Sequence, residues 1–404
     1  MQKMVLFRGG VETLTYFSEQ LAAYFETKGI SIFWYDIRDK ACSKRLRKFI
    51  KPHETVMLTF NFLGLSGEEG VYDEDKGYVW EQYDVPCINI MVDHPLYYAD
   101  RLEQVPPRYA QIVIDREHER YLREYYRELD TLGFCPLAGT SVLTKEARDA
   151  LEHPMFTDIS DWMNERPMDV VFTGNFNSCT EYEHYITRIN EEYTAFYRGM
   201  ISELLHHPKR SLTEVAKRHC IREMGQLSIE EWRDCFKCLN FIDLYLRAYM
   251  REQVLKALLD AGVKVHVYGH GYENLKVKRK ECLVEHGPAD SKTCLDAMTQ
   301  AKISLNVMPW FREGAHDRIF NAMANGSVSL TDSSTYLDEV FTDGDTVLFY
   351  DLLHLEEMAD RVKKLLEQPR KLYDISARAY RECSEKHLWK QRGEWILDRI
   401  RENI

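Results

Sequence analysis

The sequence predicts an α/β protein with two Rossmann-like domains and a helical insertion in the second. Three observations predict this: strand-like and helix-like segments alternate, they do so in two separate series, and a long purely helical stretch interrupts the second series. The length of 404 residues agrees with two domains, because one hydrophobic core rarely organises more than ~250–300 residues.

The first series predicts an N-terminal Rossmann-like domain over residues 1–165. Between the strands lie amphipathic patterns, such as the one that ends at Gly29. Strands that alternate with helices form mostly parallel sheets with helices on both faces. The expected strands are 3–8, 30–37, 54–62, 85–92 and 110–115.

The second series predicts a C-terminal domain over residues 166–380. Residues 180–260 are rich in Glu, Arg, Leu and Tyr and almost free of Gly and Pro, so we expect two or three long helices inserted there. A terminal helix is expected over residues 381–404, within an amphipathic pattern that favours packing over a ligand role. The expected strands are 168–175, 263–269, 301–307, 326–332 and 345–350, with helices at 291–300, 316–326 and 354–368.

Composition excludes several classes of protein. The net charge of −12 argues against a general nucleic-acid binder, although a local basic pocket remains compatible with it. No apolar run reaches the ~18 residues of a membrane span, and we expect a cytoplasmic protein. The ten scattered cysteines suit reduced core thiols, and the Cys235 and Cys238 pair is expected to pack structurally because no second pair completes a zinc site.

Glycine-bearing turns follow several expected strands. Gly9 and Gly10 follow the first strand, Gly174 and Asn175 stand at the end of the segment 168–175, and Gly269 stands at the end of the segment 263–269. Ligands of doubly wound sheets bind beyond the carboxyl ends of the strands, where glycine lets backbone amides approach a phosphate. A plain tight turn is the alternative at each position.

The segment 303–350 is the richest in polar groups. Its strand ends at Asn306, and a loop with Glu313 and His316 leads into a helix that carries Arg318 on its first turn. Loop amides, the positive helix end and Arg318 together suit an anionic group such as a diphosphate.

The same segment resembles the C-terminal domain of the spore-coat-type glycosyl transferase-like family (glycosyl transferases group 1), within the two-domain GT-B superfamily. The resemblance extends over roughly residues 168–400 apart from the insertion, and the N-terminal half matches only in architecture. The residues that carry it are Tyr268, Gly269, Leu305, Asn306, Gly314, Arg318, Phe320, Ala322, Ala324, Gly326, Thr331, Asp332, Phe341, Gly344 and Tyr350.

The resemblance implies a GT-B fold, with two domains facing across a cleft, and metal-independent transfer of a sugar from a nucleotide donor, UDP-type by expectation, with no cofactor. Related retaining enzymes carry two glutamates separated by seven residues on the donor loop. Glu313 fits the first position, whereas Asn321 stands at the second and leaves the stereochemistry open. The expected donor contacts are Gly10, Gly174, Asn175, Tyr268, Gly269, Asn306, Arg318 and Asn321, with catalytic roles for Glu313 and His316 and no metal ligand.

Asp93 and His94 directly follow the strand 85–92, and either could serve as a general base toward an acceptor hydroxyl. The alternative is that Asp93 caps the next helix and His94 bonds the backbone. Asn61, at the end of strand 54–62, is a weaker candidate of the same kind.

The expected partners are a nucleotide-sugar donor and a carbohydrate, protein or small-molecule acceptor. The insertion is expected to shape the acceptor site, to form an oligomer contact, or only to add a packing layer. A GT-B epimerase or phosphorylase and a scaffold without turnover are the competing functions, because fold does not fix function.

Overall fold

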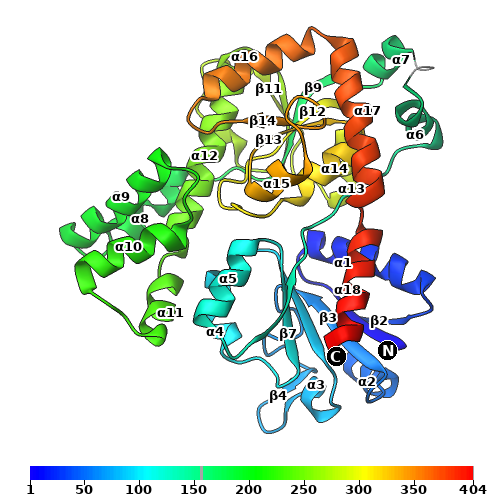
Figure 1. Cartoon of the computed structure of the whole chain (residues 1–404), viewed down its shortest axis with the longest axis vertical. Helices are drawn as coiled ribbons and strands as arrows, with labels where there is room; N and C mark the ends of the chain where they lie inside the picture. Colours follow the sequence, from blue (N-terminus) through cyan, green and yellow to red (C-terminus); the bar gives the residue numbers. More distant parts are fainter. Residues whose placement is uncertain (155–157, 404) are drawn as a thin grey trace. The chain divides into compact units, whose positions relative to one another are not determined.

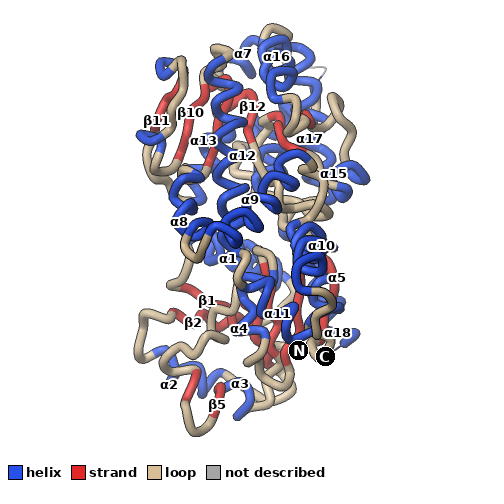
Figure 2. The backbone as a smooth tube through the Cα atoms, turned by 90° about the vertical axis from the view of Figure 1, so that its left-hand side faces the viewer, coloured by secondary structure: helices blue, strands red, loops and turns tan. Residues whose placement is uncertain are grey.

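The computed structural model describes residues 1–154 and 158–403. The chain divides into two compact units, Met1–Leu137 with Trp389–Ile404 and Ala138–Leu388. Each unit holds a six-stranded sheet, and helices surround the strands (Figure 2). The predicted α/β class with two Rossmann-like halves is therefore confirmed.

The first unit has the strand order β2-β1-β3-β6-β7-β8, with every pair parallel. The edge strand β8 was not predicted, because its residues are largely exposed or half-buried and give no apolar run. The strands are β1 Lys3–Arg8, β2 Ser31–Asp36, β3 Thr55–Phe60, β6 Cys87–Met91, β7 Tyr109–Val113 and β8 Asp130–Phe134, with a small hairpin of β4 Tyr72–Asp73 and β5 Gly77–Tyr78. The helices are α1 Glu12–Thr27, α2 Cys42–Phe49, α3 Val79–Gln82, η1 Pro95–Tyr98, α4 Ala99–Leu102 and α5 Arg116–Tyr125.

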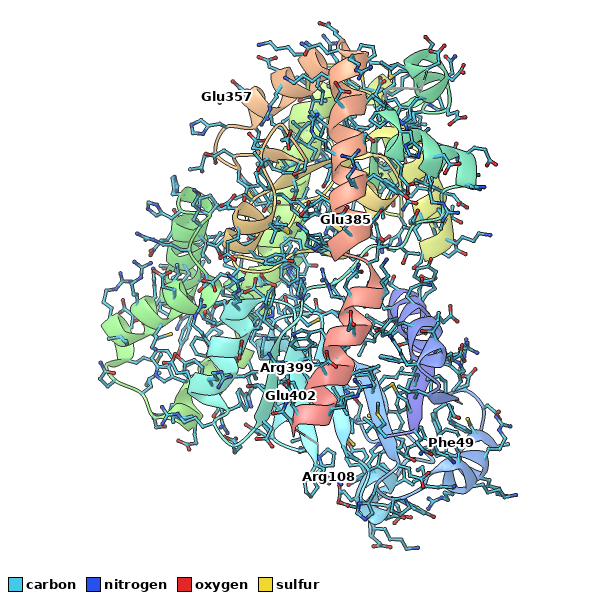
Figure 3. The ribbon with its side chains drawn as sticks, turned by 45° about the vertical axis from the view of Figure 1, so that its right-hand side comes forward. Phe49, Arg108, Glu357, Glu385, Arg399 and Glu402 are labelled. Carbon is cyan, nitrogen blue, oxygen red and sulfur yellow. The ribbon has the colours of Figure 1, made fainter. Side chains whose placement is uncertain are left out.

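The last helix, α18 (Trp389–Asn403), completes the first unit by packing beside α1 (Figure 1). The rings of Phe17 and Trp389 lie 4.9 Å apart. On its outer face Arg399 pairs with Glu402 at 3.0 Å (Figure 3). The chain thus changes unit at Leu137 and again at Trp389, rather than near residues 165 and 381 as expected.

The second unit has the strand order β11-β10-β9-β12-β13-β14, again all parallel. The three-residue edge strand β11 was too short to predict. The strands are β9 Met168–Thr173, β10 Val265–Tyr268, β11 Leu283–Glu285, β12 Ala301–Leu305, β13 Val328–Asp332 and β14 Leu348–Tyr350. The helices outside the insertion are α6 Lys145–Glu152, α7 Ile159–Asn164, α13 Ser291–Thr299, α14 Asp317–Ala324, α15 Thr335–Val340, α16 Leu355–Leu366 and α17 Pro369–Lys386, with η4 Tyr272–Asn274 and η5 Lys280–Cys282.

The insertion holds more and shorter helices than the two or three expected. Polar N-caps break the run, since the side chains of Asn190, Ser211 and Ser228 each accept a backbone N–H at the start of a helix. The elements are η3 Cys179–Tyr182, α8 Glu183–Thr187, α9 Glu191–His206, α10 Leu212–Met224, α11 Ile229–Lys237 and α12 Asn240–Asp260. In Figure 1 α9 and α10 stand away from the sheet, whereas α12 runs back to it.

The core of the second unit lies on its central strands. Val170, Phe172, Val265, Ile303 and Val328 are fully buried, which explains why these strands read as nearly continuous apolar runs. Within residues 1–154 and 158–403 no helix has both the length and the apolar character that crossing a membrane requires.

Candidate functional site

The strand order of the second unit reverses direction between β9 and β12. The chain winds outward from β9 through β10 to β11, then returns to β12 and winds the other way to β14. Doubly wound sheets bind ligands at such a switch point, beyond the carboxyl ends of the strands. Gly174 follows β9 and Asn306 follows β12, so both predicted residues stand there.

The turns after β9 and β10 interlock through their backbones. The Gly174 N–H donates to the Tyr268 carbonyl at 2.8 Å, and the Phe176 N–H donates to the His270 carbonyl at 2.9 Å. A Cβ on Gly269 would lie 2.3 Å from the Gly174 carbonyl oxygen. Gly269 is therefore required for the close approach of two turns, while Asn175 holds the second turn by accepting the His270 N–H on Oδ1.

Two arginines converge on this turn. Arg251 from α12 donates to the Asn175 carbonyl at 2.7 Å and lies 5.7 Å from the centre of the Phe172 ring. Arg318 from α14 lies 5.9 Å from the same ring, and its guanidinium borders Gly174. In the described part of the chain neither forms an ion pair with a carboxylate. Burial and the nearby charge of Arg318 lower the pKa of Arg251 to about 10. The two guanidinium groups form a positively charged cluster, and the charge of Arg318 is among the causes that lower the pKa of the neighbouring Asp317 carboxyl.

His316 begins α14 and contacts the next residue. Its Nδ1 lies 2.9 Å from Asp317 Oδ1 and 3.5 Å from the Arg318 backbone nitrogen. One nitrogen cannot serve both, and we favour an N–H donated to the carboxylate, which is nearer and accepts only. The Nε2 atom then carries the lone pair. Burial and Arg318 lower the pKa of His316, against the opposing effect of Asp317, so the ring is neutral at pH 7.

Asn321 is occupied within the protein. Its Nδ2 donates to Asp317 Oδ2 at 2.9 Å, and its Oδ1 accepts the Thr140 N–H at 2.9 Å. One turn later, Asn325 accepts the Val142 N–H and donates to the Thr140 carbonyl. These two amides fix the start of the second unit to α14. The geometry therefore favours a structural role for Asn321 over the expected ribose contact.

The loop between β12 and α14 is anchored on both sides of Glu313. The Arg312 carbonyl accepts the Thr335 N–H at 2.9 Å, and the Gly314 carbonyl accepts the Ser334 hydroxyl at 2.6 Å. Asn306, which is 1% exposed, donates from Nδ2 to Thr331 at 3.0 Å. Asn306 thus braces two strand ends, and Glu313 stands half-buried on a fixed loop.

Tyr268 has one face covered by an aromatic neighbour. Its ring stacks on His286 with 4.3 Å between centroids and 3° between planes. His286 also lies 3.0 Å from His266 through their ring nitrogens. The result is a flat aromatic platform beside the glycine turns.

In the first unit, Asp93 follows β6 and Asn61 follows β3, its sheet neighbour. Asp93 Oδ2 accepts from Asn61 Nδ2 at 3.2 Å and from the Tyr98 hydroxyl at 3.3 Å. Asn61 and Phe62 both adopt positive φ angles, 47° and 63°. Such strain costs of order 1–3 kcal/mol per residue and concentrates at functional sites. The predicted Gly10 lies near, since a Cβ there would meet the Leu63 side chain at 3.0 Å.

His94 has a different role from Asp93. It is 8% exposed, its Nδ1 accepts the Leu96 N–H at 3.1 Å, and its Nε2 lies 3.5 Å from Glu117 Oε2. The backbone-bonding alternative therefore describes His94, and it is His94 rather than Asp93 that caps the following helix. His94, Glu117 and His118 bring ligand atoms within 4.8 Å of one another. However, an Nδ1 that accepts leaves the proton on Nε2, the atom that would have to bind a metal.

Sequence reasoning missed Arg251, Asp317 and His286 as members of this site. Arg251 belongs to the helical insertion, where a long run of charged residues gave it no distinguishing mark. Asp317 was noted only as a helix start, and His286 follows the edge strand β11 that was too short to predict.

Comparisons with known proteins agree with this geometry. Residues 247–398 match the family model described as "Glycosyl transferase-like". A search of curated proteins returned no match. Among solved structures, Anabaena HepE in complex with UDP-glucose aligns over 100% of both chains with 9% identity and a TM-score of 0.54. An alpha-glucosyltransferase in complex with UDP and a 13-mer DNA aligns over 99% of both chains with 9% identity and a TM-score of 0.56.

At these identities the structural likeness establishes the fold, and the family match covers the segment that contains Arg251, Glu313, His316 and Arg318. The predicted fold is confirmed, and the predicted resemblance to a glycosyl transferase family is matched over residues 247–398. Residues 247–398 are thus similar to the glycosyl transferase-like family, and the chain shares the fold of the two transferases named above.

Proposed function

We propose that this protein transfers a sugar from a uridine diphosphate donor to an acceptor hydroxyl without using a metal ion. The observation that carries the proposal is the convergence of two guanidinium groups, Arg251 and Arg318, at the switch point of the second sheet, where neither forms an ion pair within the described residues. A nucleotide-sugar supplies the matching group, because its diphosphate carries two negative charges.

The arginine pair would act on the leaving group. As the bond to the sugar breaks, negative charge grows on the β-phosphate, and fixed positive groups stabilise that charge more than they stabilise the intact donor. The N-terminus of α14 adds its positive end from the same direction as Arg318. These groups would perform the task that a divalent cation performs in metal-dependent transferases.

The remaining donor contacts are assigned by position. The Tyr268 and His286 platform is suited to the base, and the interlocked turns of Gly174 and Gly269 leave backbone close to the diphosphate. His316, neutral and with its lone pair on Nε2, would accept a hydrogen bond from a sugar hydroxyl. Glu313, on the anchored loop, would hold the donor sugar or ribose.

Asp93 would activate the acceptor. Asn61 and Tyr98 hold its carboxylate in one orientation at the carboxyl edge of the first sheet. A carboxylate placed there can take the proton of an attacking hydroxyl. The acceptor class proposed is a hydroxyl of a glycan, a protein or a small molecule.

The experiment is a donor panel on the full chain. UDP, GDP and dTDP are titrated by calorimetry, and hydrolysis of the sugar donors is then followed with and without EDTA. We expect UDP to bind and UDP-sugar turnover to persist in EDTA. Absence of binding by all three nucleotides would contradict the donor site, and loss of turnover in EDTA alone would contradict only the metal independence.

A further inference from the structure

A cavity of about 500 Å³ lies at the carboxyl ends of β13 and β14, apart from the proposed donor site. The turn between α9 and α10 of the insertion forms one wall, and the segment after β14 forms the opposite wall. The volume falls in the range of small-molecule sites, ~300–1,000 Å³. No residue of the arginine pair or of the interlocked glycine turns contributes to its lining.

Asp332, which lines this cavity, has a carboxylate oxygen without a hydrogen-bond donor in the described part of the chain. The residue is 2% exposed, and its Oδ1 accepts the Met308 N–H at 2.7 Å and the Tyr350 hydroxyl at 3.4 Å. Its Oδ2 is buried and has no hydrogen-bond partner within the described residues. A buried carboxylate oxygen without a donor is costly, so a ligand that supplies an O–H or N–H there gains free energy.

Positive charge stands at the rim and on one side of the cavity. Lys209, on the turn of the insertion, is exposed and forms no ion pair with the residues that the structure describes, although its charge is among the causes that lower the pKa of Asp351, which also lines the cavity. Arg312 brings its charge near Asp332, whose pKa it lowers against the larger raising effect of burial. Pro208, Phe349 and Leu352 supply apolar wall between these polar groups.

We propose that this cavity binds a small phosphorylated polyol of the sugar-phosphate class, at a site separate from the nucleotide. A hydroxyl of the ligand donates to Asp332 Oδ2, the carbon skeleton lies along Phe349 and Leu352, and the phosphate is held by Lys209 and Arg312. Neither half of the ligand suffices alone, because an inorganic phosphate leaves Asp332 without its donor and a neutral sugar leaves Lys209 and Arg312 without a phosphate.

The test is calorimetric titration of the full chain with glucose 6-phosphate, glucose and inorganic phosphate, with UDP titrated in parallel. We expect glucose 6-phosphate to bind at least about tenfold more tightly than either fragment, because each charge-assisted contact contributes enough for about that factor. Lys209→Ala and Asp332→Asn should each weaken glucose 6-phosphate about tenfold and leave UDP affinity unchanged. Lys371→Ala, an exposed lysine on α17, is the matched control.

Three results would overturn the proposal: no binding of glucose 6-phosphate, equal binding of inorganic phosphate, or binding that survives both variants. Loss of UDP affinity in the same two variants would also overturn it, because the two sites would then be one. The UDP titration of the wild type reports separately on the proposed donor site.

Discussion

Arg251 and Arg318 lie against the same aromatic ring, 5.7 Å and 5.9 Å from the centre of Phe172. The two guanidinium groups repel each other, because like charges at close range interact unfavourably. Arg318 is among the causes that lower the pKa of Arg251. An anion bound to both guanidinium groups would offset this repulsion, and a diphosphate carries two negative charges that could do so.

Replacing either arginine should therefore weaken nucleotide binding without unfolding the protein. We expect Arg251→Ala and Arg318→Ala each to raise the Kd for UDP at least about tenfold, since a hydrogen bond to a charged group contributes ~1.5–3 kcal/mol. Calorimetry measures the Kd, and thermal melting without ligand should show that both variants still unfold cooperatively. Arg370→Ala, on the exposed face of α17, is the matched control. An unchanged Kd in both variants would refute the diphosphate site.

Asp93→Asn should separate chemistry from binding. The amide retains the size of the side chain but cannot take a proton, so turnover should fall by ~10²–10⁴ while UDP affinity is unchanged. The neighbouring His94→Asn is the control, because an amide oxygen can replace Nδ1 as acceptor of the Leu96 N–H. Its turnover should stay near that of wild type. Equal losses in the two variants would mean that His94 takes part in the chemistry.

The fold was predictable because both sheets are buried on two faces. Central strands such as β9 and β12 are mostly apolar and almost entirely buried, whereas the edge strands β8 and β11 are short or half-exposed and escaped prediction. The change of unit at Leu137 was also missed. It depends on Asn321 and Asn325, far along the chain, which hold Thr140 and Val142 in the second unit.

The candidate site was predictable where its members follow strands. Gly174, Gly269 and Arg318 stand at strand ends or a helix start, and they meet in the structure. Arg251 could not be found in this way, because only the tertiary path of α12 brings it to the Asn175 carbonyl. The contact of Asn321 with Asp317 was equally invisible, since hydrogen bonds do not follow from a family pattern.

That contact yields a stability prediction. Asn321→Asp keeps the side-chain size but places a carboxylate where Nδ2 lies 2.9 Å from Asp317 Oδ2. Replacing a donor by a like charge should cost roughly 1–3 kcal/mol of unfolding free energy at pH 7. Urea denaturation measures it, with Asn321→Ser as the neutral comparison. The aspartate variant should be the less stable of the two at pH 7, and the difference should shrink toward pH 4 as a carboxyl takes up a proton. A difference independent of pH would contradict like-charge repulsion.

Asp332 should make stability depend on pH in the direction opposite to most carboxylates. Burial raises the pKa of Asp332 to about 6 from its ordinary value of 3.8. The folded state therefore holds this proton more tightly than the unfolded state, and the contribution of Asp332 to stability falls as pH rises from about 4 to about 6. The amide of Asp332→Asn does not ionise, so the unfolding free energy of this variant does not fall in this way. The variant should be more stable than wild type at pH 7.5, by up to about 3 kcal/mol. The gain should vanish near pH 4.

Thermal or urea unfolding of wild type and Asp332→Asn across pH 4–8 measures this difference directly, because the other titrating groups are common to both proteins. Asp360→Asn, an exposed aspartate on α16, should show almost no difference from wild type at any pH. The contrary result is that Asp332→Asn is less stable than wild type at pH 7.5 and that this deficit is smaller at pH 4. It would mean that the Asp332 carboxylate is favourably paired rather than desolvated. Asp332 Oδ2 would then not be available to bind a ligand hydroxyl in the cavity at the ends of β13 and β14.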